Sequence, residues 1–156
     1  MKAEYVNPFY QATINVFKMM LDLEVTKNLN SIPDSKLSDE KINILIQVTG
    51  DLTGFIIYSF DSKMPLEMVK IMSGMQFDEF DSFVESAIME IANIISGNAL
   101  SNLSKQRWQC DITPPQVYTE NSKPLELKNK RVLRIPLQTK LGNLQLCISL
   151  EETKAS

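Results

Sequence analysis

The sequence predicts an α/β (α+β) fold in which helices cover a largely antiparallel β-sheet. Segments of alternating apolar residues occur as neighbouring pairs joined by short turns, which is typical of β-hairpins. Helical apolar spacing precedes the first pair, and two further helical segments separate it from the later strands. One of these helices is long and central. Grouped helices between hairpins favour a layered architecture.

Length and composition indicate a single domain over residues 1–156. The chain has 44% hydrophobic and 22% charged residues, an ordinary globular balance that can bury a core. Its net charge of −3 argues against a nucleic-acid partner. No apolar run approaches the roughly 18 residues that span a bilayer, and no apolar signal core follows Met1. We therefore expect a cytoplasmic protein without a membrane partner.

The first half of the chain predicts a helix followed by a hairpin. The helix covers residues 8–21, with Pro8 in its first turn. A polar loop is expected over residues 28–40. Residues 42–49 and 55–60 then alternate as two strands around a turn at 50–54.

The second half predicts two helices and a closing hairpin. A short helix over residues 66–72 ends at Gly74, and Asp78 or Asp81 caps a helix that continues to about Lys105. Thr113-Pro114-Pro115 breaks the chain into an extended segment. A polar loop at 121–130 precedes strands at 131–138 and 143–150.

The long helix carries a polar stripe opposite its apolar face. At about 100° per residue, with Ser86 at 0°, Glu90 lies at about 40° and Asn93 at about −20°. Apolar side chains cluster roughly 140–200° away, and these are Val84, Ile88, Ile91 and Ile95. The stripe is either ordinary solvent-exposed surface or a functional site. Gly97, at about 20° on the same wheel, serves either close helix packing or the approach of another molecule.

The residue types present exclude several chemistries. The chain contains no histidine, which rules out Ser-His and Cys-His nucleophilic arrangements. Cys110 and Cys147 are far apart and lack metal-ligand spacing, so we expect two reduced thiols and no metal site. No glycine-rich phosphate loop or cofactor motif is present. Catalysis here would rely on carboxylates, amides, water or a partner's chemistry.

The stripe also resembles a family signature. Ser86-x-x-x-Glu90-x-x-Asn93 is similar to the [Asp/Ser]-x-x-x-Glu-x-x-Asn signature of the CheC/CheX/FliY chemotaxis phosphatases. The hairpin block 49–60 and the block 111–115 resemble CheX in the same order, and the resemblance covers about residues 3–151. CheC-type members typically carry the signature twice. The single copy here favours a CheX-like chain with one site.

This resemblance implies hydrolysis of the aspartyl phosphate of the response regulator CheY. It implies that Asn93 is catalytic and positions the attacking water, and that Glu90 belongs to the catalytic pair while docking a lysine of the regulator. Ser86 and Gly97 are expected to contact the partner. No cofactor would be bound by this chain, because the regulator supplies Mg²⁺. A homodimer is also expected.

Two other functions stay open from the sequence. The chain could be a non-catalytic module that binds a receiver domain or the flagellar switch through the same helix face. It could also be a phosphatase of a response regulator outside motility, since receiver domains share one kind of phosphorylation site.

Overall fold

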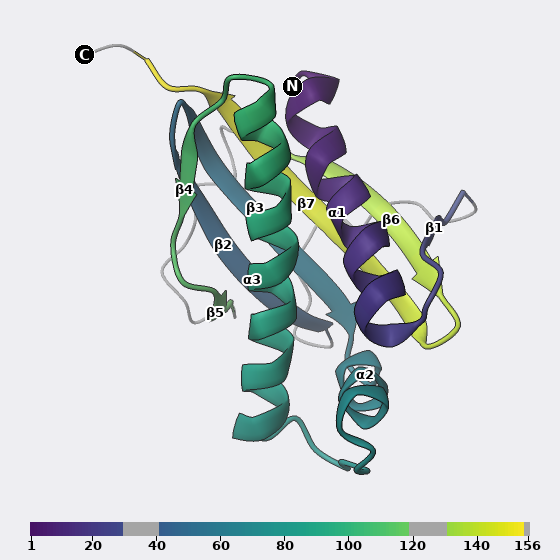
Figure 1. The fold of residues 1–156 in the computed structure, drawn as a ribbon. Coiled ribbons are helices and arrows are strands. Elements are labelled where there is room, and N and C mark those ends of the chain that lie inside the picture. Colours follow the sequence, from purple (N-terminus) through teal and green to yellow (C-terminus); the bar gives the residue numbers. More distant parts are fainter. Residues whose placement is uncertain (30–40, 119–130, 155–156) are drawn as a thin grey trace.

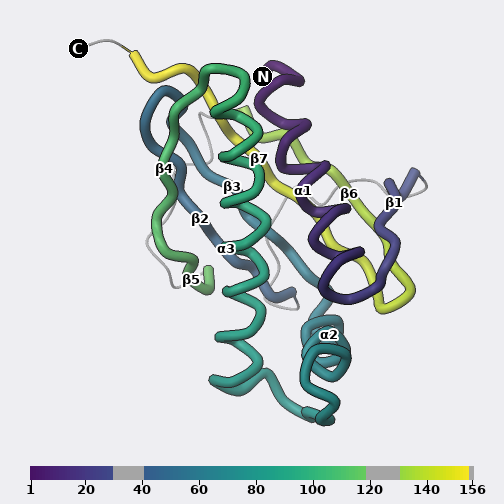
Figure 2. Tube along the Cα trace, viewed as in Figure 1, coloured from purple at the N-terminus to yellow at the C-terminus, as the bar shows by residue number. Residues whose placement is uncertain are grey.

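The computed structural model describes residues 1–29, 41–118 and 131–154. In these ranges a seven-stranded antiparallel sheet has the strand order β1-β6-β7-β3-β2-β4, and β5 also pairs with β2. Helices α1 and α3 lie side by side across one face of the sheet, and α2 lies at one end (Figures 1 and 2). The predicted fold class is confirmed.

The three helices are α1 (Ala3–Leu21), α2 (Met64–Ser73) and α3 (Ser82–Lys105). Asp81 is the N-cap of α3, since its Oδ1 accepts a hydrogen bond from the Val84 amide at 2.9 Å. Gly74 ends α2 with a φ of 73°, as predicted. The expected start of α1 was wrong, because Pro8 lies inside the helix.

The early start of α1 has a packing reason. Tyr5 and Val6 are buried, so starting the helix at Ala3 and not at Pro8 buries additional apolar surface. The amide that Pro8 lacks would have bonded to the carbonyl of Glu4. Glu4 is exposed in the first turn, where water can satisfy that carbonyl.

The strands confirm both predicted hairpins. They are β1 (Thr26–Lys27), β2 (Lys41–Gly50), β3 (Leu52–Asp61), β4 (Cys110–Ile112), β5 (Gln116–Val117), β6 (Leu133–Thr139) and β7 (Gly142–Glu152). The first turn is tighter than predicted, since only Asp51 separates β2 from β3. Gly54 consequently lies within β3, where a Cβ would overlap the carbonyl oxygen of Ser149. Of the predicted polar loops at 28–40 and 121–130, residues 30–40 of the first and the whole of the second lie outside the described residues.

The main core lies between the sheet and the helices. The four apolar residues predicted for the inner face of α3 are all fully buried there. A second, smaller cluster covers the other face of the central strands, and its buried members are Leu45, Phe55, Ile57 and Cys147. Burial on both faces explains why residues 55–58 form an unbroken apolar run.

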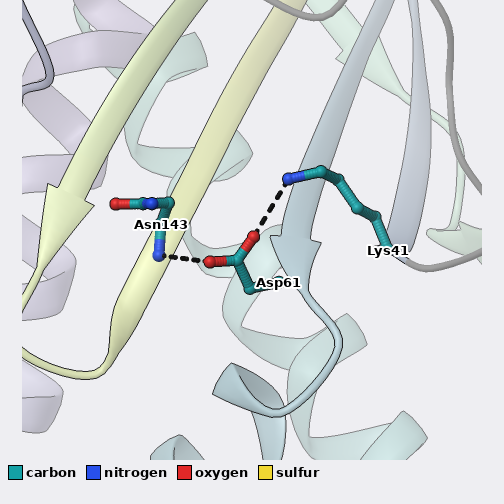
Figure 3. Close-up of polar contacts among 3 residues, drawn as sticks. All are labelled: Lys41, Asp61 and Asn143. Carbon is teal, nitrogen blue, oxygen red and sulfur yellow. Dashed lines mark hydrogen bonds and ion pairs between the residues drawn. The ribbon is translucent and has the colours of Figure 1, made fainter. Parts of the chain in front are cut away.

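One carboxylate joins the ends of three strands (Figure 3). Asp61, the last residue of β3, accepts from Lys41 Nζ at 2.9 Å and from the backbone N–H of Asn143 at 2.9 Å. Lys41 begins β2, and Asn143 lies near the start of β7. Asp61 therefore holds this end of the sheet in register.

Within the described ranges, no helix has the length and apolar character needed to cross a membrane.

Candidate functional site

The three signature residues share one face of α3 and one hollow. Ser86, Glu90 and Asn93 line an open depression of about 480 Å³ together with Met89. Ser86 and Glu90 are exposed, and Asn93 is half-buried. The facing wall comes from the last residue of β4 and the segment that connects β4 to β5. Its lining residues are Ile112, Thr113, Pro114 and Pro115.

A bulge in the sheet edge shapes this wall. Strand β4 pairs with β2 up to Ile112 opposite Val48, and pairing resumes at Gln116 opposite Leu45. Ile46 and Gln47 of β2 thus lie opposite three residues, 113–115, of the neighbouring segment. An extra residue bends the strand away from regular pairing. Because proline has no N–H to donate, Pro114 and Pro115 suit this interruption at an edge.

Thr113 anchors the bulge to the sheet. Its backbone N–H donates to the carbonyl of Gln47 at 3.0 Å, and its Oγ1 accepts from the Gln47 N–H at 3.0 Å. The backbone N–H and the carbonyl of Gln47 in β2 are therefore both bonded to Thr113 of the wall. The sheet fixes the wall at a defined place beside α3.

A buried hydrogen bond fixes the rotation of α3. The hydroxyls of Tyr58 on β3 and Ser96 on α3 lie 2.7 Å apart, and both residues are fully buried. Burial raises the pKa of the Tyr58 phenol well above its usual range, so the hydroxyl stays neutral. Ser96 follows Asn93 by about one turn. The bond therefore helps to present Asn93 toward the hollow.

Gly97 does not line the hollow, although it shares the polar face. A Cβ at Gly97 would meet no atom of the described residues within 4 Å. Close packing against another of the described helices, one of the two interpretations of this glycine, is therefore wrong. Contact of Gly97 with a partner stays a prediction.

The site offers an amide and a carboxylate to an incoming molecule. Among the described residues, none forms a hydrogen bond or ion pair with the side chain of Glu90 or Asn93. A carboxamide carries both an acceptor and two donors, so Asn93 can hold a water and an anionic oxygen together. Across residues 1–29, 41–118 and 131–154, no three Cys, Asp or Glu side chains gather as metal ligands.

Comparison with known proteins identifies the family. Residues 42–138, more than half of the chain, match the family of the chemotaxis phosphatase CheX. This chain belongs to that family. The CheY-P phosphatase CheX of Thermotoga maritima is 29% identical over 139 residues, covering 88% of each chain.

Solved CheX structures share the fold. The chemotaxis protein CheX from Vibrio vulnificus superposes with a TM-score of 0.80 at 25% identity, over 96% of this chain and 100% of that one. CheX in the CheX-CheY-BeF3-Mg²⁺ complex from Borrelia burgdorferi superposes with a TM-score of 0.74 at 26% identity, over 95% and 98%.

Family membership confirms the prediction of a chemotaxis phosphatase, an enzyme of the hydrolase class. The individual roles of Asn93, Glu90, Ser86 and Gly97 stay predictions. Sequence reasoning missed Met89 as a lining residue, although its position at about −60° on the α3 wheel places it beside Asn93.

Proposed function

We propose that this CheX-family chain dephosphorylates a CheY-like receiver domain, with Asn93 as the catalytic residue. The observation that carries the proposal is the convergence of Asn93 and Glu90 on one open hollow with a wall fixed by the sheet. An open depression on a helix suits a phosphorylated protein surface better than a small molecule, which is usually enclosed.

The reaction needs little from this chain beyond positioning. A water oxygen attacks the phosphorus in line, and the bond between phosphorus and the aspartyl oxygen breaks, releasing inorganic phosphate and a free carboxylate. Phosphoryl transfer depends mainly on alignment and charge stabilisation. The Asn93 carboxamide oxygen accepts from the water, while its N–H groups donate to a phosphoryl oxygen.

Glu90 has a different role from Asn93. A carboxylate placed against the phosphoryl group would be repelled, which argues against attack by Glu90 on phosphorus. Its exposed position one turn before Asn93 suits an ion pair with a lysine of the receiver domain. Glu90 then orients the receiver so that the phosphoryl group reaches Asn93. Ser86 lies one turn before Glu90, toward the N-terminus of α3, and contacts the partner at the rim of the hollow.

Several further features belong to this proposal. The receiver supplies Mg²⁺, which the composition of the Borrelia burgdorferi CheX-CheY complex supports for that pair, and this chain binds no cofactor of its own. Residues 1–156 act as one phosphatase domain in the cytoplasm. We also propose that the chain forms a homodimer with one site in each copy.

Phosphate release from a phosphorylated receiver tests the proposal. The wild-type chain should accelerate release, Asn93→Ala should abolish the acceleration, and binding of the receiver to Asn93→Ala should stay near wild type. Asn98→Ala removes an exposed amide on the same helix, at about 120° on the wheel, and should keep full activity. Glu90→Gln should weaken receiver binding as well as turnover.

The same assay separates the alternatives. Full activity in Asn93→Ala would overturn the mechanism. Receiver binding without any acceleration by the wild-type chain would favour the non-catalytic module. A panel of phosphorylated receivers from the organism would show whether the partner belongs to motility or to another pathway.

A further inference from the structure

Exposed apolar residues are concentrated in the stretch of chain where α2 leads into α3. Eight large hydrophobic residues are exposed among those described, and four of them fall between residues 71 and 83. These four are Ile71, Met72, Met75 and Phe83, with exposures of 46%, 38%, 57% and 54%. Single exposed apolar residues are common, but a local concentration indicates an interaction surface.

Phe83 is held in place by a second aromatic ring. Its ring stacks on that of Phe77, with centroids 5.1 Å apart and planes 12° from parallel. Phe77 belongs to the segment that precedes α3, and it also lines a small hollow of about 280 Å³ beside α2 with Leu66. The stack fixes an exposed aromatic surface before any partner arrives, which lowers the entropic cost of binding.

Phe83 lies on the same face of α3 as the catalytic stripe. It precedes Ser86 by three residues and Glu90 by seven, which places it at about 60° on the wheel. Met89, at about −60° on that wheel, lies on the side of the proline wall. On the helical wheel, Met89 and Phe83 therefore lie on opposite sides of the signature residues.

The hollow alone is too small to be the whole docking surface. A stable protein interface buries about 800 Å² on each partner through some 20–30 residues, whereas eight of the described residues line the hollow. Beyond Asn93 the exposed face of α3 continues with polar Ser101 and Ser104. Toward the N-terminus it continues with Phe83. Phenylalanine and methionine are enriched in interface cores.

We propose that Phe83, stacked on Phe77, and Met75, which is two residues before Phe77 in the chain, form an apolar docking surface for the same receiver domain that delivers its phosphoryl group to Asn93. This inference rests on the proposed function. It assigns binding to the aromatic pair and leaves the chemical step to Asn93. Loss of the surface therefore raises KM for the phosphorylated receiver and leaves kcat unchanged.

Steady-state phosphate release from Phe83→Ala and Met75→Ala tests the docking surface. Hot-spot aromatic residues typically affect binding at least tenfold, so KM for Phe83→Ala should rise by about tenfold or more, with kcat within about twofold of wild type. Met75→Ala should raise KM severalfold without touching the aromatic stack. Met19→Ala is the matched control, since Met19 on α1 is 74% exposed and far along the chain from this surface. Its KM should not change.

The outcomes distinguish this inference from the proposed function. Unchanged KM in both variants would overturn the docking surface, as would a fall in kcat with constant KM. A change in oligomeric mass of Phe83→Ala with constant KM would assign the surface to a second copy instead. An inactive wild-type chain would overturn the proposed function, while loss of calorimetric receiver binding in Phe83→Ala would still support the docking surface.

Discussion

The buried hydrogen bond between Tyr58 and Ser96 should respond asymmetrically to removal of its two hydroxyls. The oxygens are 2.7 Å apart and both side chains are fully buried, so neither can turn to bulk water. Ser96→Ala leaves the Tyr58 hydroxyl enclosed among apolar side chains. In Tyr58→Phe the serine can rotate to donate to the backbone carbonyl one turn earlier.

The expected magnitudes follow from this difference. Losing a neutral hydrogen bond costs about 1 kcal/mol, and an unsatisfied buried group costs about 1–3 kcal/mol. Alanine recovers roughly 0.5 kcal/mol of helix propensity relative to serine. We expect Ser96→Ala to lower the free energy of unfolding by about 2 kcal/mol and Tyr58→Phe by about 1 kcal/mol. The double variant should lose about 1 kcal/mol, because it leaves no orphaned hydroxyl.

Urea unfolding of the wild type, both single variants and the double variant measures these differences, with constant m-values as a check on two-state behaviour. The double-mutant cycle should give a coupling energy of about 2 kcal/mol in favour of the intact pair. Additive single effects, or Ser96→Ala costing no more than Tyr58→Phe, would refute the claim that this bond is a closed, water-free link between β3 and α3.

Three further predictions follow from individual residues. Because burial raises the Tyr58 pKa above its ordinary value of about 10, its contribution to stability is complete below pH 10 and is lost as pH rises toward the folded-state pKa. Urea unfolding between pH 9 and 11 should show that Tyr58→Phe loses less stability with rising pH than the wild type does. Above pH 10 the two free energies of unfolding should diverge by up to about 1.4 kcal/mol per pH unit. Gly97→Ala should raise the free energy of unfolding in urea by about 0.5–1 kcal/mol, because its Cβ meets no atom of the described residues within 4 Å. The KM for the receiver should also rise if Gly97 contacts the partner. Asp81→Ala should lower the free energy of unfolding by about 1 kcal/mol through loss of the bond to Val84, and Asp81→Asn should restore most of it.

Local patterns predicted the large elements well. The stop at Gly74 and the inner face of α3 depend on neighbours within one helical turn, which the sequence displays directly. The sequence also narrowed the N-cap to Asp78 or Asp81, and the structure places it at Asp81. The two hairpins were predicted for the same reason, since alternation and a short turn are local features. The start of α1 was not predicted correctly. Proline usually lies in the first turn of a helix, but the burial of Tyr5 and Val6 in the core extends α1 before Pro8.

Short strands and the wall of the hollow were beyond sequence reasoning. Strands β1, β4 and β5 contain two or three residues each, too few to show any alternation. They exist because other strands pair with them. The bulge at 113–115 depends on Gln47, which is 66 positions away in the chain. Pro114 and Pro115 predicted an interruption of the strand, but they did not indicate that the interrupted segment would lie opposite β2.

By itself, the sequence determined the fold class, the long helix and the alignment of Ser86, Glu90 and Asn93 on one face, because the helical period sets which residues share a side. Only the tertiary structure decided that this face borders a hollow, that the wall across it is a bulge of the sheet edge, and that Phe83 stacks on a ring from outside its own helix. Those features arise from contacts between segments distant in the chain, and no local periodicity encodes such contacts.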